Sequence, residues 1–185
     1  KYNQGDREVR DKDEECTTNE ACEVSEAQKI SRMCFVCGQQ NSMGLHAQFL
    51  NLKDGRLYTR FKTLEEHQSY PGRVHGGVIS AVLDEAIGRV IQVNNPDTFG
   101  VTIELNVKFR KPVPLGVELT VVAWETKHSH RLLAGEGELL LEDGSVAASA
   151  SGRYLRMSVD AITDGGLMDS DWLDDLRGYP QEVLV

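Results

Sequence analysis

The chain has 185 residues, of which 40% are hydrophobic and 26% charged, and its formal net charge is −9. This composition is typical of one globular domain, and the acidic charge argues against a nucleic-acid partner, which would require a basic surface. No apolar run approaches the roughly 20 residues that span a bilayer, so we expect no membrane partner. The polar start of the chain and its four irregularly spaced cysteines indicate a cytoplasmic protein without a disulfide framework.

Residues 1–31 are acidic and hydrophilic and are expected to form a polar arm. This arm is either disordered or contains one short helix between Asn19 and Ile30. Asn19 or Thr18 could cap such a helix, and glutamates 20, 23 and 26 would suit its early turns. We place the folded domain at residues 32–157.

A β-hairpin is expected over residues 44–62. Two apolar segments flank Lys53-Asp54-Gly55, which is a strong turn signal. In the second segment, Leu57, Thr59 and Phe61 alternate with charged or polar residues, as in a half-buried strand.

The segment from Gly76 to Val93 predicts a helix that is apolar on nearly every face, and Pro96 limits its extent. A helix that is hydrophobic all round is a buried helix. Asp84 and Glu85 lie in its middle, and burying a charge is costly unless the charge is paired or hydrogen-bonded. A buried acid beyond a glycine-rich helix start predicts a catalytic site.

Four strands are expected after the helix, over residues 101–109, 117–126, 131–141 and 145–157. A single helix that is apolar on all sides must be wrapped by the sheet. The sequence therefore predicts an α+β fold, with an antiparallel sheet around one long central helix. The acidic tail, residues 158–185, is expected to carry a short amphipathic helix that includes Leu167, Trp172, Leu173 and Leu176.

This order of elements, with His75-Gly76-Gly77 followed by Asp84, resembles the hotdog-fold acyl-CoA thioesterases, in particular the PaaI-like branch. Three further segments carry the resemblance, which covers roughly residues 32–157: 34–38 leading to 44–45, 70–74, and 108–114. It implies an acyl-CoA substrate and thioester hydrolysis. It also implies a homodimer or homotetramer with the active site at a subunit interface, and we expect no cofactor.

Thioester hydrolysis requires a base or nucleophile and donors for the developing oxyanion. The first amides of a helix have no intrahelical partner, so Gly76 and Gly77 are candidate donors, and the resemblance favours Gly76. Alternatively, these glycines only permit a tight entry into the helix. Asp84 is the candidate base or nucleophile; the alternative is an ion pair with Arg89 or with a partner chain. Glu85 faces about 100° away on the helix and is interpreted as structural.

The resemblance also implies that Thr102 helps to hold the attacking water, although a threonine is common in any strand. Some relatives carry an asparagine six residues before the histidine. Here that position is Ser69, next to Gln68, and either residue or neither replaces the amide. His67 and His75 are further candidates, His75 as an orienting residue at the helix start; the alternative for both is a solvated or structural role.

The pair Cys34-x-x-Cys37 raises the possibility of a zinc site, which typically has four ligands. Cys16, Cys22 or His46 would have to complete it, and the resemblance favours a turn without metal, so no metal is expected. A group of basic residues near strand ends could contact the phosphates of coenzyme A or could be ordinary solvated charge; its members are Lys108, Arg110, Lys111, Lys127, His128, His130 and Arg131.

Two other functions fit the same fold. The missing asparagine and the acidic ends favour a non-catalytic acyl-CoA binder or sensor. A hydratase or dehydratase is also conceivable, but that reaction would prefer an Asp and His pair near the helix start.

Overall fold

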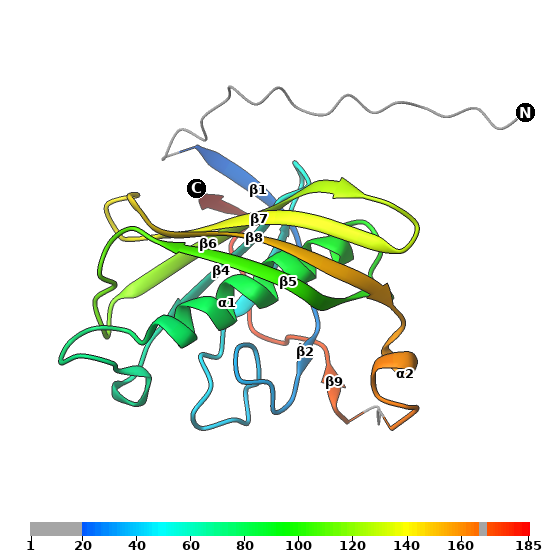
Figure 1. Cartoon of the computed structure of the whole chain (residues 1–185), viewed down its shortest axis with the longest axis horizontal. Helices are drawn as coiled ribbons and strands as arrows, with labels where there is room; N and C mark the ends of the chain where they lie inside the picture. The colour runs from blue at the N-terminus through cyan, green and yellow to red at the C-terminus, as the bar shows by residue number, and fades with distance from the viewer. Residues whose placement is uncertain (1–19, 167–169) are drawn as a thin grey trace, which may run out of the picture.

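The computed structural model describes residues 20–166 and 170–185 (Figure 1). Helices and strands follow one another in this order: β1 (Ala21–Ala27), β2 (Ile30–Ser31), β3 (Gln48–Leu52), β4 (Leu57–Lys62), the 3-10 helix η1 (Glu65–His67), α1 (Gly76–Arg89), the 3-10 helix η2 (Val90–Val93), β5 (Phe99–Phe109), β6 (Glu118–His128), β7 (Leu132–Leu140), β8 (Val146–Met157), α2 (Val159–Ile162), β9 (Trp172–Leu173) and β10 (Glu182–Leu184).

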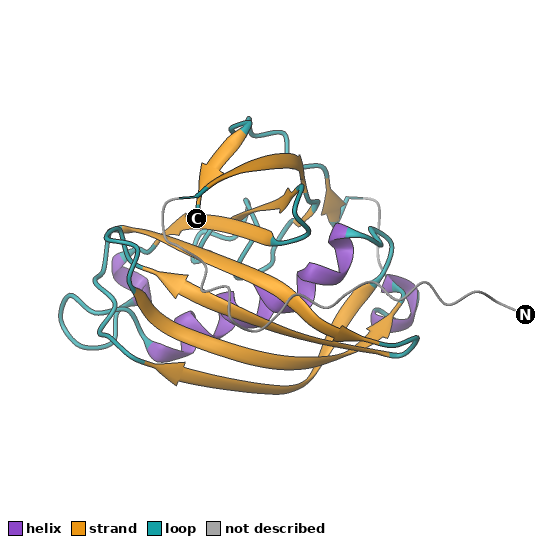
Figure 2. Ribbon diagram, turned by 90° about the horizontal axis from the view of Figure 1, so that it is seen from above, coloured by secondary structure: helices purple, strands orange, loops and turns teal. Residues whose placement is uncertain are grey.

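The strands form a large antiparallel sheet that surrounds α1. Within the described residues, the sheet has eight strands in the order β10-β1-β3-β4-β6-β7-β8-β5, and β2 pairs separately with β9. Helix α1 lies lengthwise against the sheet, and Figure 2 shows strands on either side of it. This arrangement confirms the predicted hotdog fold.

Helix α1 is buried because most of its surface is apolar. Ile79, Val82, Leu83, Ala86 and Ile87 are each at most 4% exposed and belong to the main hydrophobic core. The predicted helix over residues 76–93 is confirmed, with its last turn in 3-10 geometry. No helix in the described parts of the chain combines the length and the apolar character needed to cross a bilayer.

The prediction of a short helix between Asn19 and Ile30 is wrong. Residues 21–27 form strand β1, which pairs with β3 and β10. Cys22 and Val24 are buried, whereas Glu23 between them is exposed, which is the period of a strand. Glu23 and Glu26, which suit a helix start, are instead exposed residues of β1, and Glu20 precedes the strand. Pairing with β3 selects the extended conformation.

The prediction of an amphipathic helix in the tail is also wrong. Trp172 and Leu173 form β9, Leu176 is 94% exposed, and Leu167 lies outside the described residues. The helix in this region, α2, is a single turn that ends before these residues. Strand β10 instead adds to β1, where Val183 joins a second core cluster on the outer face of the sheet.

Candidate active site

Two hydroxyl groups hold the carboxylate of Asp84. Thr102 donates a hydrogen bond from Oγ1 to Asp84 Oδ1 at 3.0 Å and lies 3.2 Å from Oδ2. The Tyr154 hydroxyl lies 3.0 Å from Asp84 Oδ1 and 3.1 Å from the Asp84 backbone oxygen. Asp84 is half-buried on α1, and the described part of the chain contains no ion pair to it. The carboxylate is therefore oriented by neutral donors.

A β-bulge in β5 brings Thr102 to Asp84. Thr102 pairs with Tyr154, and the next pair is Glu104 with Arg153, so that Ile103 is an extra residue in the strand. Without this bulge, strict alternation would place Thr102 on the face opposite Leu105, away from the helix. Bulges often re-aim a side chain next to an active site. The prediction that Thr102 belongs to the site thus depends on a local irregularity that the sequence pattern does not reveal.

Tyr154 on β8 is a site residue that the sequence analysis missed. The residue is 1% exposed, and burial together with the Asp84 charge raises the pKa of its hydroxyl above the usual range. A side chain at Gly152 would place its Cβ 2.6 Å from the Tyr154 ring and hydroxyl, so glycine is needed for this close approach. The available signal was a tyrosine on the buried face of β8, because a buried phenol needs a hydrogen-bond partner.

At the start of α1, one backbone amide has no partner among the residues that the structure describes. His75 is the N-cap residue, and its Nδ1 accepts a hydrogen bond from the Gly77 amide at 2.8 Å. The amides of Val78 and Ile79 donate to the His75 backbone oxygen. In the described ranges, the Gly76 amide donates to no protein group. Of the predicted donors, Gly76 is therefore available and Gly77 is already used by His75.

The loop before the helix is fixed by its own hydrogen bonds. His67 is 2% exposed; its Nδ1 accepts from the Leu64 amide at 3.0 Å, and its Nε2 lies 2.8 Å from the Met43 backbone oxygen. Gln68 accepts from the Gly72 amide through Oε1 at 2.8 Å, and Ser69 is exposed. These contacts give His67 and Gln68 structural roles in the loop, and their predicted contacts with substrate remain predictions.

The structure separates the predicted residues into two groups within one chain. Asp84 lies eight residues after Gly76 on the same helix, which corresponds to about 12 Å along the helix axis. A carbonyl bound to the Gly76 amide is therefore too far from Asp84 of the same chain for direct attack. The alternative pairing of Asp84 with Arg89 is wrong, because Arg89 pairs with Glu85 at 2.8 Å.

The basic residues also divide into two groups. Strand register places Phe109 beside Ala148 and His128 beside Leu133, at opposite ends of the sheet. Residues 108–111 therefore lie at the Phe109 end of the sheet, and residues 127–131 lie at the His128 end. Arg110 donates to Ser149 Oγ at 3.1 Å, and His128 pairs with Glu125. Within one chain, these residues form no single phosphate-binding cluster.

Comparisons with known proteins agree with this architecture. Residues 71–148 match the family model of the thioesterase superfamily. An uncharacterised protein of Schizosaccharomyces pombe is 34% identical over 93 residues, which are 48% of this chain and 53% of that protein. Human acyl-coenzyme A thioesterase 13 is 24% identical over 78 residues, 42% of this chain and 56% of that enzyme. The chain thus spans about half the length of the curated relatives it matches.

Solved structures show the same fold. Protein RHA08564, described as a thioesterase superfamily protein, has a TM-score of 0.62 and 27% sequence identity, and the match covers 66% of this chain and 63% of that one. The PaaI protein of Escherichia coli has a TM-score of 0.56 and 16% identity, with coverage of 62% and 81%. The chain therefore has the hotdog fold, and its residues 71–148 are similar to the thioesterase superfamily.

Proposed function

We propose that the protein hydrolyses an acyl-CoA thioester to a free acid and coenzyme A. The observation that carries this proposal is the Asp84 carboxylate, oriented by Thr102 and Tyr154, in a fold that also presents the unpaired amide of Gly76. The thioesterase superfamily match and the name of the human relative support the reaction class.

Asp84 supplies the base or the nucleophile. As a base, it takes a proton from a water that attacks the thioester carbonyl; as a nucleophile, it forms an anhydride that water then hydrolyses. In either route the carbon–sulfur bond breaks and the coenzyme A thiolate is protonated. The two strong hydrogen bonds fall on Oδ1, which leaves Oδ2 the freer oxygen for proton transfer or attack.

Gly76 stabilises the oxyanion. An amide at a helix N-terminus points at the ligand and lies at the positive end of the helix dipole. Since the Gly76 and Asp84 of one chain are about 12 Å apart, we place both groups at one substrate only when two chains combine.

The strand β5 provides the surface for this combination. It is an 11-residue edge strand that pairs only with β8 in the described chain, and Ile103 and Phe109 on it are 55% and 56% exposed. A long edge strand with exposed apolar residues is a template for pairing with another chain. We therefore propose a homodimer joined through β5, alone or within a homotetramer.

A two-fold antiparallel pairing of β5 would assemble the site. Thr102 lies at Asp84, whereas the Phe109 ring lies 3.5 Å from the position of a Cβ on Gly76. Thr102 and Phe109 are at opposite ends of the strand. A two-fold axis near Leu105 therefore brings the Asp84 end of one chain to the Gly76 end of the other. The same operation brings residues 127–131 of one chain toward residues 108–111 of the other, where we propose that coenzyme A phosphates bind.

The first experiment compares Asp84→Asn with the wild type on a panel of short, medium, long and aromatic acyl-CoAs, using a thiol-reactive dye. A lost general base reduces turnover by about 10²–10⁴-fold, so kcat should fall by that amount. Asp160→Asn, the same change on the exposed start of α2, is the matched control and should leave kcat unchanged. Full activity of Asp84→Asn would refute the assignment. Binding of acyl-CoA without release of thiol by the wild type would support the sensor function instead.

A further inference from the structure

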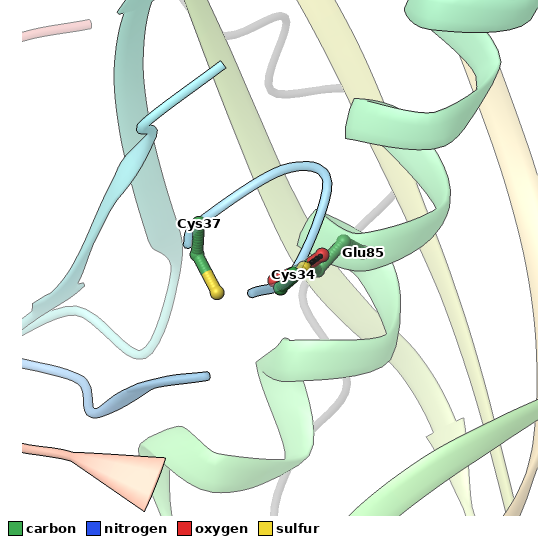
Figure 3. A group of neighbouring side chains, drawn as sticks. All are labelled: Cys34, Cys37 and Glu85. Atoms are coloured by element: carbon green, nitrogen blue, oxygen red, sulfur yellow. Dashed lines mark hydrogen bonds between the residues drawn. The ribbon is translucent and has the colours of Figure 1, made fainter. Parts of the chain in front are cut away.

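A second cluster of reactive side chains lies away from the Asp84 carboxylate, where a turn packs against α1. Cys34 and Cys37 come from this turn and Glu85 from the helix (Figure 3). Their ligand atoms all lie within 4.8 Å of one another, and Cys34 Sγ is 3.0 Å from Glu85 Oε2. In a tetrahedral zinc site the ligand atoms lie about 3.5–3.8 Å apart, so small side-chain movements would bring these three around one ion.

The turn directs backbone amides at both sulfur atoms. Val36 donates to Cys34 Sγ at 3.3 Å, and Ser31 donates to Cys37 Sγ at 3.4 Å. Amides in these positions would also donate to the sulfur atoms when a metal ion is bound to them. The turn closes with a bond from the Gly38 amide to the Cys34 oxygen at 3.0 Å, and a Cβ on Gly38 would lie 2.4 Å from that oxygen. Glycine at position 38 is thus needed for this turn.

Arg89 orients the cluster from its buried side. Its guanidinium donates to Cys37 Sγ at 3.1 Å and to Glu85 Oε1 at 2.8 Å, and the residue is 6% exposed. Two thiolates and one carboxylate would carry three negative charges, which Arg89 and a divalent cation would neutralise. Without an ion, the two thiol protons balance the charge instead. A metal can therefore enter this buried site without leaving net charge, provided that it replaces both protons.

We propose that Cys34, Cys37 and Glu85 bind a zinc ion, with a water molecule in the fourth position. The thiolate and carboxylate donors suit zinc rather than magnesium or calcium. The ion would join the turn to α1 one residue beyond Asp84, as a structural clamp rather than part of thioester hydrolysis. A disulfide between Cys34 and Cys37 would remove the thiol that donates to Glu85 Oε2, whereas a metal ion would bind this carboxylate together with both sulfur atoms, which favours the metal.

This ligand set differs from the one considered from sequence spacing. Cys22 lies on β1, where its Sγ accepts from Arg56, and His46 bonds to the Asn41 backbone oxygen at 2.8 Å. Cys16 lies outside the described residues. The third ligand instead comes from a helix 51 positions away in the sequence.

The test uses the full chain, reduced and freed of metal by a chelator, and titrated with Co²⁺ and then Zn²⁺. One equivalent of Co²⁺ should give the sulfur-to-cobalt charge-transfer band and the visible bands of a four-coordinate site, and Zn²⁺ should displace it. Cys34→Ser and Cys37→Ser should each lose at least half of the charge-transfer intensity, whereas Cys22→Ser should keep it. No band with the wild type, or a band unchanged in both variants, would overturn the proposal.

Proton release by the wild type provides a readout that does not depend on a variant folding. Binding of Zn²⁺ to two protonated thiols in a weakly buffered solution should release about two protons per ion. Release of none, or a chain in which Cys34 and Cys37 are found oxidised to a disulfide that resists a mild reductant, would also overturn it. Neither measurement uses turnover, so this proposal can fail while the proposed thioesterase activity stands.

Discussion

Replacement of Gly76 by proline tests the proposed oxyanion donor because it removes the one backbone N–H that would bind the oxyanion. Proline has no N–H and is well tolerated at the first position of a helix. Gly76 is the first residue of α1, and its amide donates to no described protein group, so the helix loses no hydrogen bond. The preceding His75 has φ −66° and ψ 136°, an extended conformation that a following proline accepts.

The matched control is Gly76→Ala, which adds a side chain and keeps the amide. An alanine Cβ would lie 3.5 Å from the Phe109 ring, an ordinary van der Waals distance. Both substitutions reduce the freedom of the unfolded chain and should stabilise the protein by about 0.4–1 kcal/mol. A loss of activity in the proline variant is therefore not expected to reflect unfolding, and thermal denaturation checks this.

Removal of one oxyanion donor costs about 10²–10³ in kcat. We expect a loss of this size in Gly76→Pro, with a smaller change in KM, and nearly wild-type turnover in Gly76→Ala, measured by thiol release from the best acyl-CoA. A folded Gly76→Pro enzyme with wild-type kcat would refute the role of this amide. Equal losses in the two variants would show that the added bulk, and not the missing hydrogen, is responsible.

The same variant tests whether two chains form the site. Gly76→Pro and Asp84→Ala chains, unfolded together in equal amounts and refolded, assemble at random. If the two groups come from different chains, about one quarter of the sites contain neither change, because each contributing chain is intact in half of the cases. Activity near that fraction of the wild type is expected, and activity no higher than the mean of the two parents would place both groups in one chain.

Three further predictions follow from the geometry around Asp84 and β5. Tyr154→Phe removes one of the two hydroxyl donors to Asp84; because a hydrogen bond to a charged group contributes about 1.5–3 kcal/mol, kcat should fall roughly 10- to 100-fold with KM little changed, and an unchanged kcat would exclude a positioning role. The raised pKa of Tyr154 means that the folded state keeps this proton when the unfolded chain releases it. The protonated Tyr154 hydroxyl therefore contributes its full stability below about pH 10, and this contribution is lost as the pH rises further. Above that pH, the free energy of unfolding of the wild type should fall by about 1.4 kcal/mol more per pH unit than that of Tyr154→Phe. Ile103→Lys places a charge on the exposed edge strand, and this variant should be a monomer by light scattering and should have low activity. The control Ile162→Lys changes a residue of α2 that is 42% exposed and should leave the oligomer intact. Equal masses for both variants would argue against assembly through β5.

The elements that the sequence predicted well are those whose pattern is local. The apolar helix over 76–93, the turn at Lys53-Asp54-Gly55 and the strands after residue 100 depend on neighbours within a few positions, and the structure confirms each of them. The segment 21–27 was assigned wrongly because its glutamates fit a helix start, whereas its conformation is determined by β3 and β10, which lie far away in the sequence. Local propensity yields to strand pairing in such a case.

The candidate site shows the same division between local and long-range information. Gly76 and His75 could be placed at the start of a helix from their spacing alone, and the N-cap bond of His75 then explains why Gly76 and not Gly77 keeps a free amide. Tyr154 could not be found in this way, because it reaches Asp84 across 70 positions of sequence. Thr102 reaches Asp84 only because one extra residue in β5 reverses the direction of its side chain.

Asp84 and Glu85 illustrate why adjacent acids can have different functions. They are separated by about 100° around the helix, so one faces β5 and β8 and the other faces the turn at Cys34. Two neutral hydroxyls surround Asp84, which leaves an anionic carboxylate with an oxygen available for chemistry. Arg89 and Cys34 occupy both oxygens of Glu85, which leaves it no free oxygen unless a metal replaces the thiol proton. We therefore base the proposed catalytic role of the first acid and the proposed structural role of the second on the partners that the fold supplies, and not on the type of residue.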